Sequence, residues 1–171
     1  MTVSTQRPDT PASVFIALGS NLGDRAEHLR IALERLHSPP HREVVATSDF
    51  YETDPVGGPA DQPTFLNAVA HIRTIESPRE LMNEMLRIES DRGRIRAERW
   101  GPRSLDLDLL VFADRIIDEP GLRAPHPRLA HRRFVLEPWA QIAPDLMVVG
   151  FDASVTELLR RLDGDPQSSG A

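Results

Sequence analysis

The stretch that decides the predicted fold reads SLDLDLL and covers residues 104–110. Side chains alternate between the two faces of a β-strand, so Asp106 and Asp108 project from one face and the intervening leucines from the other. Burial of the leucines in a core fixes the register of this strand. The same burial therefore fixes the direction in which both carboxylates point.

The two carboxylates of this strand form a candidate metal site. They stand about 6 to 7 Å apart, two strand rises, and like charges at that separation repel unless a cation or solvent compensates them. Mg²⁺ accepts such oxygens readily and commonly combines one or two carboxylates with substrate phosphates. An exposed strand with alternating polar residues would show the same pattern, and the pattern alone favours that simpler interpretation.

An arginine-rich segment lies directly upstream and reads GRIRAERWGPR over residues 93–103. Arginine stays charged at any working pH and can bind phosphate oxygens through two parallel hydrogen bonds. Gly93, Gly101 and Pro102 predict an irregular, mobile lid. The segment could also be a solvated loop whose arginines pair with nearby glutamates. Its position beside the carboxylate pair favours a polyphosphate clamp, because phosphoryl transfer needs metal ions and arginines around the phosphates.

A second basic segment follows the strand and reads APHPRLAHRRF over residues 124–134. His126 stands between two prolines and could donate to a phosphate oxygen, although a lone histidine is more often structural. Phe134 could belong to the core or stack on a flat heterocycle. On an earlier predicted strand, Phe65 and Asn67 share a face, which puts an aromatic ring beside a carboxamide. Together these residues describe a slot for a planar polar ring beside a polyphosphate clamp.

Hydrophobic periodicity and turn signals predict the other elements. Strands are expected at 13–18, 43–51, 65–74 and 105–112, with 115–117 as a short hairpin partner, and helices between 22 and 36, from Ser77 and from Ser154. This order predicts an α+β, ferredoxin-like βαββαβ sandwich: an antiparallel sheet with helices packed on one face, plus a small hairpin and a C-terminal helix. The fold hosts many unrelated activities and assigns no function by itself.

Length and composition bound the class of protein. The 171 residues suit one domain, 1–171, with an ordered core at about 13–163 and disordered termini. The net charge of −6 argues against a general nucleic-acid binder. No apolar run approaches the roughly 18 residues that cross a bilayer, and the absence of Cys excludes disulfides and thiol catalysis. We expect a cytoplasmic monomer without nucleic-acid or membrane partners.

Four blocks of the sequence carry a resemblance to a known family. They read ALGSNLG at 17–23, FLNA at 65–68, RWGPRSLDLD at 99–108 and PHPRLAHRRF at 125–134. On these blocks the chain resembles the 6-hydroxymethyl-7,8-dihydropterin pyrophosphokinase family over residues 14–162. The third block is the most specific of the four.

The resemblance implies a reaction and its catalytic groups. Members transfer the β,γ-pyrophosphoryl group of ATP to the pterin hydroxymethyl and leave AMP, a step of folate biosynthesis. By matching position, Asp106 and Asp108 would hold two Mg²⁺ ions between the triphosphate and the attacking hydroxyl. Arg94 and Arg96 would lie on the mobile catalytic loop, with Arg94 stabilising the transferring group.

The resemblance also implies the two binding sites. The nucleotide site would be lined by Glu89, Trp100, Arg103, His126 and Arg132. The pterin would lie between Phe65 and Phe134, Asn67 would hydrogen-bond it, and the main chain of Thr53 and Val56 would close the pocket. Residues 54–63, a predicted loop, would form a second moving lid.

Two other functions stay open at this point. A non-catalytic ferredoxin-like module could use the arginines to hold RNA or an acidic partner, but it would need aromatic residues on an open sheet face and a basic charge. The chain has only one Tyr, two Trp and six Phe. A kinase that transfers a single phosphate from the same site is the other alternative. Residue chemistry does not separate the two transfers, whereas the product nucleotide does.

Overall fold

The computed structural model describes three stretches of the chain, residues 3–56, 60–93 and 104–164. Within them the elements are β1 (Ala12–Ser20), α1 (Arg25–Leu36), β2 (Arg42–Thr47), β3 (Tyr51–Thr53), β4 (Phe65–Thr74), α2 (Pro78–Asp91), β5 (Asp106–Phe112), β6 (Ile117–Glu119), β7 (Leu122–Ala124), the 3₁₀ turn η1 (Leu129–His131), α3 (Arg133–Ile142), β8 (Met147–Val148), β9 (Ala153–Ser154) and α4 (Val155–Gly164). None of the helices in these stretches is long and apolar enough to cross a membrane.

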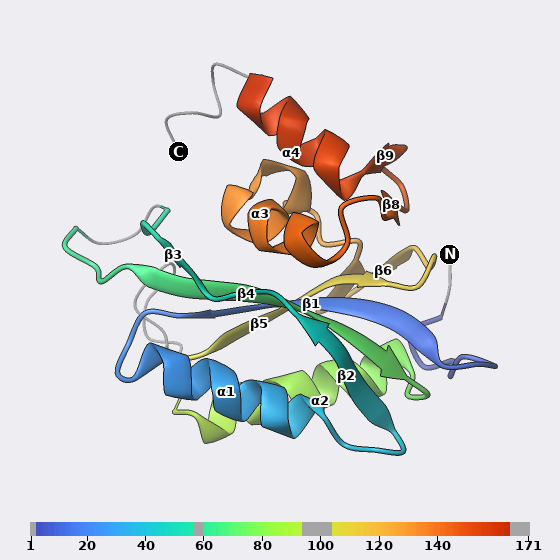
Figure 1. Ribbon diagram of the computed structural model, residues 1–171. Helices are drawn as coiled ribbons and strands as arrows, with labels where there is room; N and C mark the ends of the chain where they lie inside the picture. Colours follow the sequence, from blue (N-terminus) through green and yellow to red (C-terminus); the bar gives the residue numbers. More distant parts are fainter. Residues whose placement is uncertain (1–2, 57–59, 94–103, 165–171) are drawn as a thin grey trace.

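The central sheet has the strand order β2-β4-β1-β5, and β3 also pairs with β4. Every pairing in it is antiparallel, with β1 and β4 in the middle (Figure 1). A βαββαβ chain produces this order when both crossover helices pack on the same face of the sheet. The predicted ferredoxin-like α+β class is confirmed.

Local sequence signals set the helix starts. At α2, the Ser77 backbone N–H donates to the Glu80 carboxylate at 2.8 Å, and the Glu80 N–H donates back to the Ser77 hydroxyl at 3.2 Å. Pro78 occupies the first helical position, where no backbone N–H is needed. Ser154 and Glu157 make the same reciprocal pair at α4, at 3.0 and 3.1 Å. Both predicted helix starts are confirmed, and each such cap contributes about 1 kcal/mol.

One face of the sheet is covered by α1 and α2 (Figure 1). Alternate leucines in and just before β5 are almost fully buried there: Leu105, Leu107 and Leu109 are 0%, 5% and 2% exposed. They pack in one cluster with side chains from both helices, including Leu29 and Met85. The predicted register of the SLDLDLL strand is confirmed, and the carboxylates are therefore turned to the opposite face.

The opposite face is covered by α3, and α4 packs on the side of α3 that is away from the sheet (Figure 1). Trp139 of α3 and Leu158 of α4 join Phe15 and Leu110 of the sheet in a second buried cluster. The prediction of helices packed on one face holds for α1 and α2, and the predicted C-terminal helix is α4. The helix α3 was not predicted, because no helix was expected at 133–142. That segment begins in a basic run and contains Pro138, a residue disfavoured inside helices.

Two strand predictions need correction. The expected strand at 43–51 is two strands, interrupted at Ser48. The Ser48 N–H still donates to the Val69 carbonyl at 2.9 Å, but the Val69 N–H donates to the Ser48 hydroxyl at 2.9 Å, and that hydroxyl donates to the Asp49 carbonyl at 2.8 Å. The hairpin partner expected at 115–117 does not pair with β5. Instead β6 pairs with β7 around the Pro120–Gly121 turn, where Gly121 has a φ of +74°.

The N-terminal segment, predicted to be a frayed end, makes specific contacts with the rest of the domain. Ser4 is only 1% exposed. Its backbone carbonyl accepts from the Arg79 N–H at 2.9 Å, and its N–H donates to Glu119 Oε1 at 3.0 Å. Ser4 therefore bonds both to the first turn of α2 and to the β6–β7 hairpin.

Candidate functional site

The site begins as a row of residues across the middle of the sheet. Asp106 of β5 is opposite Gly19 of β1, and Gly19 is opposite Asn67 of β4. Register partners on neighbouring strands share a face, so the carboxylate and the carboxamide flank the glycine. A Cβ added at Gly19 would approach Asn67 Oδ1 to 2.8 Å. Because glycine has no side chain, the backbone in the middle of this row stays accessible to a flat group that lies across it.

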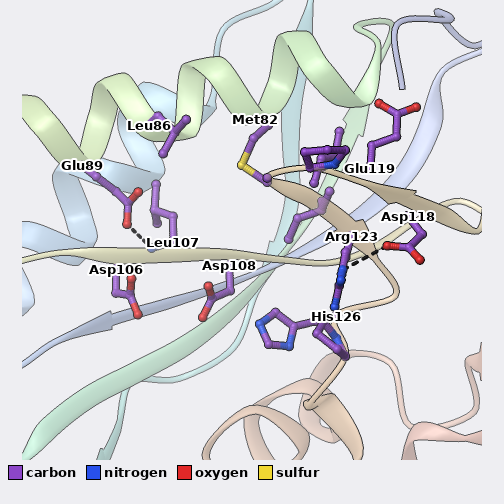
Figure 2. Close-up of a pocket in the computed structure, with 15 residues that line it drawn as sticks. Met82, Leu86, Glu89, Asp106, Leu107, Asp108, Asp118, Glu119, Arg123 and His126 are labelled. Atoms are coloured by element: carbon purple, nitrogen blue, oxygen red, sulfur yellow. Dashed lines mark hydrogen bonds and ion pairs between the residues drawn. The ribbon is translucent and has the colours of Figure 1, made fainter. Parts of the chain in front are cut away.

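Two cavities open from this row. The larger, of about 1180 Å³, extends over β1 and β4 toward α3, and the smaller, of about 630 Å³, lies between α2 and the β6–β7 hairpin. Asp106, Asp108, His126 and Pro127 belong to the walls of both. The two carboxylates point away from α2, toward the side on which His126 lies (Figure 2). The two carboxylates therefore lie where a ligand in one cavity would approach a ligand in the other.

The carboxylate pair is partly exposed and faces positive charge. Arg132 Nη1 lies 3.4 Å from Asp108 Oδ2, and the Arg132 guanidinium also lies 5.5 Å from the centre of the Phe134 ring. Among the described residues no group of three or more His, Asp or Glu side chains could hold a metal ion. Two half-exposed carboxylates instead fit a hard divalent ion that takes its remaining ligands from water and substrate phosphates.

His126 is a neutral hydrogen-bond donor in this site. Its Nδ1 accepts from the Arg128 N–H at 3.1 Å, so the neutral ring carries its proton on Nε2. Burial lowers its pKa to about 4, and the charges of Arg132 and Arg128 lower it further against the opposing effect of Asp106. At neutral pH the ring can thus donate from Nε2 without adding a charge.

Glu89 holds the strand that carries the carboxylates. It is 3% exposed, and its Oε2 accepts from the Leu107 N–H at 3.1 Å (Figure 2). Leu107 stands between Asp106 and Asp108, so this bond ties α2 to the backbone midway between the two carboxylates. Glu89, which was predicted to line the nucleotide site, also lines the smaller cavity.

The residues predicted around the pterin line one cavity. The larger cavity contacts all five of them: Thr53, Val56, Phe65, Asn67 and Phe134. Asn67 is 6% exposed and donates from Nδ2 to Thr53 Oγ1 at 2.5 Å, while Val56 stays 50% exposed at the rim. Strand β4 and the start of α3 thus supply the aromatic rings and the carboxamide to this cavity, and β3 supplies Thr53.

Some predicted residues lie outside the described stretches, and some contributors were not predicted. Arg94, Arg96, Trp100 and Arg103 fall within residues 94–103, outside the description. Sequence reasoning did not single out Gly19 or the β6–β7 hairpin, whose residues Asp118 to Arg123 line the smaller cavity. The Pro120–Gly121 pair is a turn signal that could have located the hairpin.

Solved structures share this fold. The wild-type HPPK-DHPS of Plasmodium falciparum with SDX-DHP superposes with a TM-score of 0.74 at 13% identity, covering 99% of this chain and 47% of that one. Its A437G form with pteroate gives a TM-score of 0.70 at 14% identity, covering 94% of this chain and 45% of that one. The chain spans less than half the length of these proteins. At such identity the likeness establishes the fold, an α+β ferredoxin-like domain.

Sequence comparison identifies the family. The model of 7,8-dihydro-6-hydroxymethylpterin-pyrophosphokinase (HPPK) matches residues 15–144. The 2-amino-4-hydroxy-6-hydroxymethyldihydropteridine pyrophosphokinase of Pseudomonas aeruginosa is 46% identical over 133 residues, 78% of this chain and 82% of that protein. The one of Haemophilus influenzae is 42% identical over 149 residues, 87% and 92% of the two chains. The chain belongs to the 7,8-dihydro-6-hydroxymethylpterin-pyrophosphokinase family, so it is an enzyme and not a non-catalytic binding module.

Proposed function

We propose that this chain transfers the β,γ-pyrophosphoryl group of ATP to the hydroxymethyl group of 6-hydroxymethyl-7,8-dihydropterin and releases AMP. Membership of the family supports pyrophosphate transfer to a hydroxymethyldihydropterin, a step of folate biosynthesis. The ATP donor, the metal ions and the roles of individual residues are our proposal. The observation that carries it is the pair Asp106 and Asp108 in the walls of two cavities at once.

The two cavities take the two substrates in this proposal. The pterin lies in the larger cavity, between the rings of Phe65 and Phe134, and Asn67 pairs with its polar edge beside the main chain of Thr53 and Val56. The nucleotide lies in the smaller cavity between α2 and the hairpin. Its phosphates then lie beside the carboxylates, which is where the pterin hydroxyl must reach for an in-line transfer.

Asp106 and Asp108 are the residues that would hold two Mg²⁺ ions. When bound, the ions would neutralise phosphate charge and favour ionisation of the attacking hydroxyl. The chain's own contribution is positioning: Glu89 fixes the backbone between the carboxylates, and buried leucines on the reverse face fix their direction. His126 would donate from Nε2 to a phosphate oxygen, and Arg132 would add charge nearby.

The remaining roles rest on the family resemblance. Arg94 would stabilise the transferring group and Arg96 would assist it. Trp100 and Arg103 would contact the nucleotide. The chain would act as one domain and as a monomer.

The nucleotide product tests the proposed function. The chain is incubated with ATP, Mg²⁺ and the hydroxymethyl pterin, and the nucleotides are separated and identified. Formation of AMP with the pterin diphosphate is expected, at equal rates. ADP with a pterin monophosphate would instead identify a single-phosphate kinase on the same site. The Asp106→Asn/Asp108→Asn double variant is the control for contaminating activities.

A further inference from the structure

A short N-terminal arm, residues 3–7, joins two elements that form opposite walls of the smaller cavity. Ser4, buried at 1% exposure, donates from its backbone N–H to Glu119 Oε1 at 3.0 Å and from its hydroxyl to Glu119 Oε2. Its carbonyl accepts from the Arg79 N–H at 2.9 Å. Glu119 ends β6 and Arg79 lies in the first turn of α2, so one arm residue bonds to both walls.

Glu119 is the centre of this contact. Arg79 Nη2 donates to its Oε2 at 3.3 Å and to the Pro120 carbonyl at 3.4 Å. The Glu119 carboxylate thus accepts from the arm and from α2 together, in hydrogen bonds assisted by its charge. The bonds from Ser4, and then the guanidinium of Arg79, lower the pKa of Glu119, so the carboxylate is ionised at neutral pH.

Two further side chains, Arg7 and Arg115, fasten the arm. Arg7 donates to the Glu80 carboxylate, with Nη2 at 2.6 Å from Oε1 and Nε at 3.0 Å from Oε2. Arg115, in the chain that leads into β6, donates from Nη1 to the Gln6 carbonyl at 2.7 Å. The arm is therefore tied to α2 through Glu80 and to the hairpin side through Arg115.

The hairpin needs such support. Its strands have three residues each and form a two-stranded sheet of their own, and an isolated two-stranded hairpin is marginally stable in water. Ile117 and Leu122 anchor it in the main core, while Asp118 and Glu119 belong to the wall of the smaller cavity that Met82 and Leu86 of α2 also line (Figure 2).

We propose that the N-terminal arm is a clamp that sets the distance between the β6–β7 hairpin and α2, with Ser4 and Glu119 as positioning residues for the nucleotide. The inference rests on the proposed function, which assigns the smaller cavity to ATP. Opening the clamp widens that cavity and leaves untouched the carboxylate pair and the pterin slot, which belong to β5, β1 and β4. The clamp thus acts on nucleotide binding and not on the chemical step.

Kinetics and binding of matched variants test the clamp. Ser4→Ala and Glu119→Gln are each expected to raise the KM and the Kd for Mg-ATP about three- to tenfold, with kcat and the pterin KM within about twofold of the wild type. Ser4→Thr keeps the hydroxyl and should restore most of the affinity. Because Ser4 and Glu119 bond to each other, their effects on the Kd in the double variant should be less than additive.

Ser13→Ala is the matched control. It also removes a serine hydroxyl, one that lies 2.7 Å from His71 Nε2 on the far part of the β1–β4 pair. It should leave the Kd for Mg-ATP unchanged. An unchanged Kd in both Ser4→Ala and Glu119→Gln would overturn the proposal, and so would an equal rise in Ser13→Ala.

Amide hydrogen exchange, measured without nucleotide, tests the clamp independently of the assignment of the smaller cavity to ATP. The clamp predicts faster exchange in residues 117–124 of Ser4→Ala, with the β1–β4 pair unchanged. If the wild type failed to bind ATP, the proposed function would fall. In that case, faster exchange in the hairpin of Ser4→Ala would still support the clamp, and unaltered exchange there would contradict it.

Discussion

The two faces of the sheet have different functions, and β5 contributes side chains to both of them. Toward α1 and α2 its leucines enter a closed apolar core. On the reverse face, Leu110 is 1% exposed in the second core, while Asp108, only two residues earlier, opens onto both cavities. One strand thus combines a face that supplies stability with a face that supplies chemistry, and the change from core to site occurs within two residues.

A local irregularity marks this change. The pairing of β1 with β5 shifts register between Phe15 and Ile16, which leaves Leu110 as the extra residue of β5. Such a bulge bends a strand and changes the direction of its side chains. On one side of the bulge α3 covers the sheet, and on the other side the row through Gly19 stays open. The comparison predicts that substitutions on the two faces have separable effects.

The largest effect is expected on the open face. Asp106→Asn and Asp108→Asn each keep the size of the side chain and remove its charge, so turnover should fall by about a thousandfold or more. The free energy of unfolding should change by less than about 1 kcal/mol, because both side chains are partly exposed. AMP release and urea unfolding measure the two quantities. Asp114→Asn, on the exposed turn after β5, should change neither; retained turnover in the site variants would contradict the assignment.

The closed face should show the reverse. Leu107→Ala removes a side chain that is 5% exposed and should lower the free energy of unfolding by about 2 to 4 kcal/mol. Val45→Ala on β2, where the side chain is 48% exposed, should cost less than about 0.5 kcal/mol. Urea unfolding compares the two variants. A loss below about 1 kcal/mol at Leu107 would mean that this face is not the stabilising one.

A smaller effect is expected at Gly19, in the middle of the row that joins Asp106 to Asn67 on the open face. Gly19→Ala places a methyl group 2.8 Å from Asn67 Oδ1, so the carboxamide must move. The pterin KM should rise about tenfold, since a displaced hydrogen-bonding group no longer matches its partner, while the ATP KM stays within about twofold. Gly164→Ala, at a helix end with open space around it, is the control. A wild-type pterin KM in Gly19→Ala would place the pterin elsewhere.

The smallest effect concerns pH. The His126 pKa is about 4 in the folded chain, below the ordinary value of 6.5, because of burial and two arginines. Between these values the unfolded chain binds more protons than the folded one, so stability falls as pH drops from 6.5 toward 4. His126→Asn removes this contribution. Urea unfolding at several pH values should give a shallower pH dependence for the variant, and identical dependences would contradict the lowered pKa.

Much of the fold followed from local patterns. The alternation in residues 104–110 located the buried and open faces of β5, and the Ser77 and Ser154 caps located two helix starts, because these signals depend only on near neighbours in the chain. The helix at 133–142 was missed since Pro138 argues against a helix locally, whereas burial of Trp139 against the sheet outweighs that cost. Tertiary packing overrode a local rule there.

The site was less accessible to residue-by-residue reasoning. The pairing of Asp106 with Gly19 and of Gly19 with Asn67 depends on strand register, which no single segment encodes. Similarly, the contact of Ser4 with Glu119 joins residues 115 positions apart. The residues were grouped by resemblance to a family, and the structure shows that the described ones line two adjoining cavities.

Binding of a non-hydrolysable ATP analogue, titrated with and without Mg²⁺, tests the central claim most directly. In the wild type, Mg²⁺ should tighten binding about tenfold or more, because the ion bridges the phosphates and the carboxylates. In the Asp106→Asn/Asp108→Asn variant this gain should disappear, while binding without Mg²⁺ should remain or improve. The same Mg²⁺ gain in both proteins would show that the paired carboxylates are not the metal site.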